Sequence, residues 1–315
     1  MNHEAYLIGK KPFRHVWLGL SIAASWAWGV SIIVGMQVIQ QKGLGAFLIW
    51  AAANALTLLV FGFLIKKVGQ KTIQNIMPAG AQPVYKVLTL TIQFFSLLVN
   101  LTAIKLAMSI LGVTWAWTFF AALILAIVLI KGFSGSVKGD IVQLAIWMFL
   151  MVGALCLAEK TSFAVAQSNI GQLQWALWGA VILFAAPIVD LQMWQRKESM
   201  RHTLSIKPFV VATIVFAIYM VFVGLFGIYN LNTPAVTAGV ILFVAGSTLL
   251  SALSAISIYG KNIKQSRYLM TIFLATAALA MLFNASILSL WLVYGSVRVP
   301  FSAYLVYLIL KRGNG

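Results

Sequence analysis

Long apolar runs separated by short polar and basic stretches dominate this chain. A helix needs about 20 mainly apolar residues to cross the hydrocarbon core of a bilayer. Runs of that kind predict ten transmembrane helices, over residues 16–40, 44–65, 84–111, 114–131, 138–158, 174–194, 207–229, 235–260, 267–284 and 286–311. We therefore expect an all-α membrane protein embedded in a lipid bilayer.

Composition and charge support this fold class. Of 315 residues, 62% are hydrophobic and only 9% are charged, which is too little charge for the surface of a soluble domain. The net charge of +17 does not indicate a nucleic-acid partner, because the basic residues are spread over short loops. With a cytoplasmic N-terminus, eighteen of the 22 Lys and Arg residues fall on the cytoplasmic side. We expect an integral plasma-membrane protein (bacterial inner membrane) with both termini in the cytoplasm.

Two of the apolar runs are interrupted. Small, polar and aromatic residues fill the centre of Ser21–Ser31, and Pro187 follows Leu183 and Phe184 in the second half of the chain. Irregular backbone at bilayer depth is tolerated only where it lines a cavity. Interrupted helices at matching places in two halves point to the binding site of a secondary transporter.

The two interruptions also suggest how the chain is divided. Five predicted helices precede an exterior loop and five follow it, so the second half enters the membrane in the opposite sense. We expect two inverted five-helix repeats in which helices 1 and 6 are discontinuous. The expected parts are a cytoplasmic N-terminus over 1–15, a first repeat over 16–158, an exterior loop over 159–173 and a second repeat over 174–312.

Catalytic chemistry is not indicated. The single cysteine, three histidines and five acids lie far apart in the sequence, with no metal-ligand spacing and no nucleophile–base motif. We expect no enzyme activity and no organic cofactor. The oligomeric state cannot be read from the sequence.

Three motifs resemble the sodium:solute symporter family, which has a LeuT-type five-plus-five inverted-repeat fold. They are AASWAWG at Ala23–Gly29, GFSGSVKGDIVQ at Gly132–Gln143 and DLQMWQRKES at Asp190–Ser199, and Gly246–Ser257 is a weaker fourth match. Together they cover most of the chain in the family's order, in a minimal ten-helix version. The resemblance implies sodium-coupled symport of a small organic solute by alternating access.

The same resemblance implies a sodium site. The carbonyls of Ala23 and Trp26 would face the hydroxyl of Ser247, and Asp140 would lie on the ion's exit path. The family commonly uses two adjacent hydroxyls, and the first of them aligns with Gly246, so one hydroxyl is missing. Two other interpretations stay open, a small-residue packing stripe around Ala23 and a helix N-cap at Asp140.

Substrate contacts are expected at the two interruptions. Aromatic walls with few polar groups suit a small, partly apolar or cationic solute, although ordinary packing also explains aromatic residues here. The expected contact residues are Ser25, Trp26, Trp28, Gly29, Leu183, Phe184 and Pro187.

Four further polar residues are candidates for gating or structural roles. Asp190 precedes Gln192 and Arg196, and we expect Arg196 or backbone amides to hold its carboxylate. Arg298 lies inside an apolar run before Pro300, where it would form a gate, contact an anion or extend to the membrane interface.

Two other functions stay open at this stage. A non-transporting receptor or regulatory protein could keep the symporter fold, and the missing hydroxyl favours it. A proton-coupled transporter would need no sodium site. A channel would need a continuous polar pore, which the predicted helices do not show.

Overall fold

The computed structural model describes residues 2–9, 13–157, 167–200, 204–229, 234–281 and 287–312, so most of the expected exterior loop lies outside the described residues. Those residues form helices and no strand, which confirms the predicted all-α class. The elements are α1 (His3–Ile8), α2 (His15–Trp26), α3 (Gly29–Val68), α4 (Ile73–Ile76), η1 (Ala79–Ala81), α5 (Gln82–Ile110), α6 (Ala116–Leu157), α7 (Ile170–Val189), α8 (Leu191–Ser199), α9 (Lys207–Tyr229), α10 (Pro234–Ile256), η2 (Ser257–Tyr259), α11 (Ile263–Ala280) and α12 (Ile287–Arg312).

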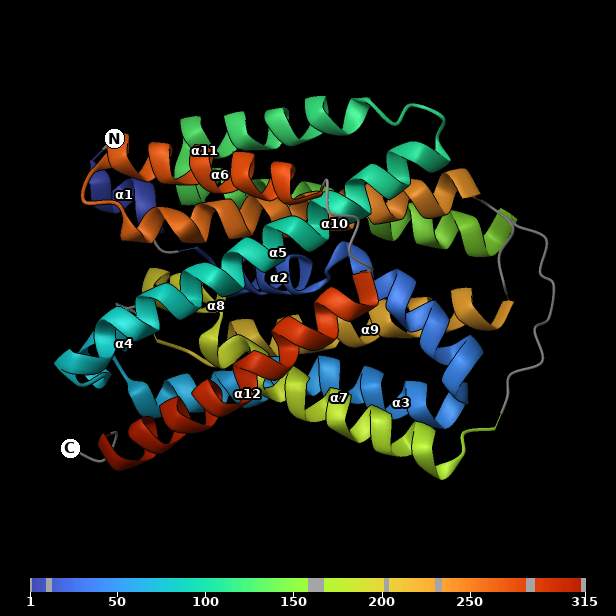
Figure 1. Ribbon diagram of the computed structural model, residues 1–315, viewed down its shortest axis with the longest axis horizontal. Coiled ribbons are helices and arrows are strands. Elements are labelled where there is room, and N and C mark those ends of the chain that lie inside the picture. The colour runs from blue at the N-terminus through green and yellow to red at the C-terminus, as the bar shows by residue number, and fades with distance from the viewer. Residues whose placement is uncertain are drawn as a thin grey trace.

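Seven helices in the described part of the chain are long and apolar enough to cross a membrane. Two of them, α3 and α6, have 40 and 42 residues, whereas a straight helix of 40 residues would measure roughly 60 Å, about twice the hydrocarbon core. Each contains one glycine with positive φ and non-helical geometry, Gly43 and Gly132. The chain turns back at these points (Figure 1), close to the boundaries predicted from the sequence.

The turn in α6 is fixed by the N-terminal helix. Gly132 has φ of 59°, and a Cβ atom there would collide with the backbone carbonyl of Tyr6. The hydroxyl of Tyr6 donates a hydrogen bond to the carbonyl of Val128, one turn earlier, at 3.0 Å. The predicted interhelical segment 132–137 is therefore a break at one residue, and helix resumes at Phe133.

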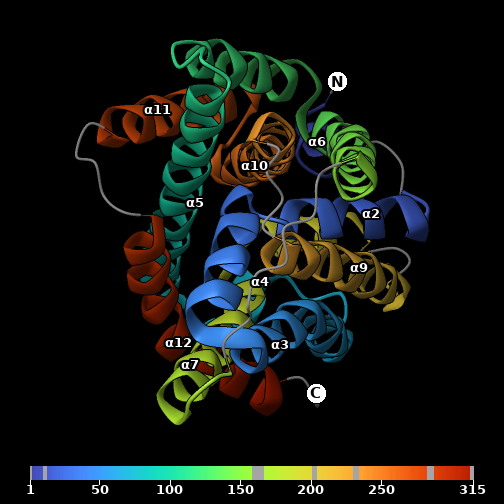
Figure 2. The ribbon, with the colours of Figure 1, turned by 90° about the vertical axis from the view of Figure 1, so that its right-hand side faces the viewer.

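Helix α10 lies between α5 and α6 (Figure 2) and packs mainly against these two helices. Helix α3 packs against α9 and α7, α2 against α9 and α6, and α12 against α7 and α5. Large apolar side chains such as Phe149, Trp115 and Phe119 point outward and are exposed. This apolar exterior and the seven long helices support an integral membrane protein. Helix α1 and the C-terminal end of α12 lie at one end of the molecule, opposite the start of α7 (Figure 1).

Candidate functional site

The first interruption lies where the sequence predicts it. Helix α2 ends at Trp26, Ala27 and Trp28 leave helical geometry, and α3 begins at Gly29. Hydrogen bonds from other helices satisfy the freed backbone groups, as buried polar groups require. The side-chain oxygen of Asn100 accepts from the Gly29 amide at 3.2 Å, and the hydroxyl of Thr248 donates to the Ala27 carbonyl at 3.2 Å.

The second interruption lies a few residues later than predicted. Leu183 to Pro187 are part of α7, and the helix ends at Val189. Proline cannot donate to the carbonyl four residues before it, so the Leu183 carbonyl needs another donor. The hydroxyl of Thr57 supplies it at 2.9 Å, which allows the helix to continue. The break comes at Asp190, whose carboxylate accepts from the Gln192 amide at 2.9 Å and so caps α8.

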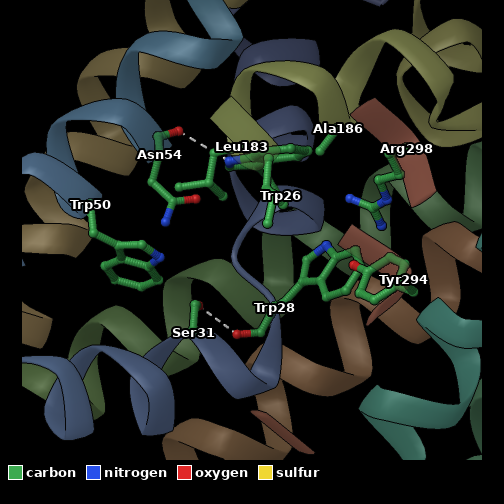
Figure 3. A pocket seen from close by; sticks show the side chains of 10 residues that line it. Trp26, Trp28, Ser31, Trp50, Asn54, Leu183, Ala186, Tyr294 and Arg298 are labelled. Carbon is green, nitrogen blue, oxygen red and sulfur yellow. Dashed lines mark hydrogen bonds between the residues drawn. The ribbon is translucent and has the colours of Figure 1, made fainter. Parts of the chain in front are cut away.

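A small cavity lies between the first interruption and α7, about one turn before the second interruption (Figure 3). Its volume is about 30 Å³, enough for about one or two water molecules, so the site is almost closed in this conformation. The lining residues come from α2, α3, α7 and α12 and from the break after α2: Trp26, Trp28, Ser31, Trp50, Asn54, Ile182, Leu183, Ala186, Tyr294 and Arg298.

Three of the seven expected contact residues, Trp26, Trp28 and Leu183, line this cavity. The other four, Ser25, Gly29, Phe184 and Pro187, are not part of its wall. The Ser25 hydroxyl donates to the Ile22 carbonyl of its own helix at 3.0 Å. Gly29 packs against Ala245 so closely that a Cβ would collide with it. Trp50, Asn54 and Tyr294 were not predicted from the sequence, because nothing in their local pattern separates them from ordinary core residues.

Arg298 reaches the cavity from α12. Its side chain is 3% exposed, and its guanidinium lies 3.9 Å from the ring centre of Tyr294 and 5.3 Å from that of Trp28. The Trp28 and Tyr294 rings are stacked, with centres 5.4 Å apart and 9° between their planes. This burial excludes one of the three alternatives for Arg298, namely that its side chain extends to the membrane interface.

A second polar site surrounds Asp140, which lies inside α6 and is therefore not a helix N-cap. Its Oδ2 contacts the guanidinium of Arg196 at 2.8 Å and accepts from the Ser21 hydroxyl at 2.6 Å. Its Oδ1 accepts from the Ser247 and Ser251 hydroxyls at 2.8 and 3.1 Å. All five residues are buried, so this cluster joins α2, α6, α8 and α10. Ser21 and Ser251 were not predicted.

In the structure, the residues that the sequence suggested as sodium ligands make hydrogen bonds with other protein groups. The Ala23 and Trp26 carbonyls accept from the amides of Ala27 and Trp28, each at 2.9 Å. Ser247 donates to Asp140, and Thr248 reaches the interruption instead. Gly246 faces α6, where a Cβ would approach the Gln143 side-chain oxygen to 2.7 Å. Ser247 and Thr248 are thus adjacent hydroxyl residues of α10 that make contacts in different directions, Ser247 with Asp140 and Thr248 with the first interruption.

Asp190 and Gln192 form a polar junction with Gln93 at the start of α8. The carboxylate of Asp190 also accepts from the Gln93 side chain at 2.8 Å, and Gln192 donates to the oxygen of Gln93 at 3.4 Å. A backbone amide and Gln93 therefore hold Asp190, whereas Arg196 pairs with Asp140. In the described part of the chain, no three or more His, Cys, Asp or Glu residues gather as metal ligands.

The comparisons with known proteins agree with this architecture. No protein-family model and no curated protein matches the sequence. Among solved structures, the chain is similar to the substrate-bound outward-open state of a Na⁺-coupled sialic acid symporter, with 13% identity and a TM-score of 0.64. The match covers 98% of this chain and 80% of that one. This chain therefore shares the overall fold of a membrane transporter.

Proposed function

We propose that the protein is a secondary active transporter that couples uptake of a small organic solute to sodium by alternating access. The observation that carries the proposal is that one buried cavity is lined by the interruption between α2 and α3 and by the last part of α7, about one turn before the break at Asp190. Discontinuous helices around a midplane cavity are typical of such transporters. The structurally similar protein is a Na⁺-coupled symporter, which supports the same function.

The proposed membrane arrangement follows the turns at Gly43 and Gly132. Because these turns divide α3 and α6, ten spans in two inverted repeats fit the helices, with the chain ends in the cytoplasm of a bacterial cell. Non-helical backbone at Ala27–Trp28 and Asp190 would let the two halves of each broken helix tilt separately, which would open the cavity to one side at a time.

The proposed sodium site lies beside the first interruption. Sodium favours hard, uncharged or anionic oxygens, and the Thr248 hydroxyl with the Ser25 and Ala27 carbonyls offers three. The neighbouring Ser247 hydroxyl links this site to Asp140, which lies on the proposed exit path. Arg196 balances the charge of Asp140, so the buried acid does not need the ion to be stable.

Sodium is expected to raise the melting temperature of the purified protein, compared with choline chloride at equal ionic strength. A ligand that binds only the folded state stabilises it, by about 2.7 kcal/mol at a concentration 100 times its dissociation constant. Thr248→Val keeps the side-chain shape but removes the hydroxyl, and should abolish the sodium-dependent increase. The measurement is thermal unfolding in detergent across a sodium titration.

Thr276→Val is the matched control. Its hydroxyl is exposed and donates only to the Ile272 carbonyl of its own helix at 2.8 Å, so the sodium response should persist. Equal melting temperatures in sodium and choline at every concentration would contradict sodium coupling. A proton-coupled transporter or a solute receptor would then account better for the fold.

A further inference from the structure

The cavity wall carries a positive charge, Arg298, that no carboxylate contacts in the described part of the chain. Arg298 forms no ion pair within the described residues, where the ion pairs present are Arg196 with Asp140 and Lys197 with Glu198. Its Nε and Nη2 atoms are buried and have no hydrogen-bond acceptor there. A buried charged donor without a partner is costly, so it usually marks a site where a ligand completes the contacts.

The geometry of this guanidinium suits one kind of anion. Nε and Nη2 lie along the same edge of the guanidinium plane, and together they match the two oxygens of a carboxylate. The rings of Tyr294 and Trp28 contact the guanidinium, while its Nε and Nη2 atoms have no hydrogen-bond partner in the described part of the chain. Phe95 also stacks on Tyr294, with ring centres 6.0 Å apart. These ring contacts restrict the orientation of the Nε–Nη2 edge, here called the fork, before any ligand binds.

The opposite wall of the cavity also offers donors. The Asn54 side-chain nitrogen and the Trp50 indole nitrogen are buried without acceptors, and both point into the cavity, across from Arg298 (Figure 3). No Asp or Glu is among the lining residues. Asp190 is near enough to attract Arg298, but its Oδ1 already accepts from Gln93 and the Gln192 amide. The cavity thus has an excess of donors, whereas a cationic solute would need acceptors.

We propose that the solute is a small organic carboxylate. Its carboxylate would bind the Nε–Nη2 edge of Arg298, and a hydroxyl or carbonyl oxygen at its other end would accept from Asn54 and Trp50. This inference rests on the proposed transport function and names the substrate class of the same cavity. It differs from the sequence-based expectation of a small, partly apolar or cationic solute.

The test is binding to the purified full-length protein at a fixed sodium concentration. The probes are lactate, pyruvate and N-acetylneuraminate, with lactamide and methyl pyruvate as neutral counterparts. Isothermal titration calorimetry should show that at least one carboxylate binds and that the neutral compounds do not. Arg298→Gln should weaken that binding at least about 30-fold, since removing one partner of a buried charged pair is expensive. Arg298→Lys keeps the charge but lacks the fork, so its affinity should be intermediate.

Lys311→Gln is the matched control. Lys311 is also a cation over a tyrosine ring on α12, 5.6 Å from the ring centre of Tyr307, but it is exposed and outside the cavity. Its removal should leave carboxylate affinity unchanged. The sodium-dependent change in melting temperature reports whether each variant is folded, and Arg298→Lys keeps the test usable if Arg298→Gln does not fold.

The outcomes separate the two proposals. Sodium stabilisation without binding of any of the three carboxylates would overturn this inference and leave sodium-coupled transport standing. The same holds if Arg298→Gln binds a carboxylate as tightly as the unchanged protein, or if lactamide binds as tightly as lactate. Loss of both the sodium response and carboxylate binding in the unchanged protein would overturn both proposals.

Discussion

Replacing Asp140 with alanine should lower the free energy of unfolding by about 3–5 kcal/mol, because the variant leaves the guanidinium of Arg196 buried without its counterion. Both side chains are fully buried, and three hydroxyls are oriented by the same carboxylate. The measurement is reversible unfolding in mixed detergent micelles.

Two further variants test the cause of that loss. A double variant, Asp140→Ala with Arg196→Met, removes both charges and should recover part of the stability, because replacing a whole buried pair by apolar groups is often neutral. Glu198→Ala breaks the partly exposed ion pair with Lys197 and should cost at most about 1 kcal/mol. A loss below about 1 kcal/mol for Asp140→Ala would contradict the view of this cluster as a joint between four helices.

Replacing Trp28 with alanine should cost a similar amount, about 3–5 kcal/mol, which is typical for removing a buried large aromatic side chain. Trp28 is 7% exposed, stacks on Tyr294 and lies beneath the guanidinium of Arg298. Its loss would leave a void between α3 and α12 and remove one of the two rings that orient the fork. The measurement is again unfolding in mixed micelles.

Trp115→Ala is the control for that variant. Trp115 is 74% exposed at the surface, so its removal should change the free energy of unfolding by no more than about 0.5 kcal/mol. Equal losses for the two tryptophans would mean that the aromatic stack contributes no more than a surface residue.

The sequence predicted the helices and the first interruption better than the second. Around Gly29, several small and polar residues weaken the helix together, and the break lies among them. In α7 the prediction relied on Pro187, which removes one donor but does not end a helix whose freed carbonyl finds another. The actual end depends on Asp190 capping the next helix, and its additional partner Gln93 lies about one hundred residues earlier.

The residues of the site were harder to predict than the helices. Adjacent positions on a helix point about 100° apart, so an alignment that is wrong by one residue assigns the wrong side chain to a site. The sequence pointed to Gly246 and Ser247, whereas the hydroxyl that contacts the first interruption in the structure belongs to Thr248. Asn54 and Trp50 lie in an ordinary apolar run, and only the rotation of α3 about its axis brings them to the cavity. Arg298, which lines the cavity, could be singled out from the sequence because a charge inside an apolar run is rare.

The most direct test of alternating access is the labelling of a cysteine placed in the cavity wall. In a Cys156→Ser background, which removes the exposed native thiol, Ala186→Cys puts a thiol on a lining residue that is 1% exposed. A membrane-impermeant maleimide is added to right-side-out and to inside-out vesicles, each with sodium or choline. We predict that the cysteine is labelled from both sides of the membrane, and that sodium changes the ratio between the labelling rates in the two kinds of vesicle. Labelling from neither side, or from the same single side under every condition, would contradict it.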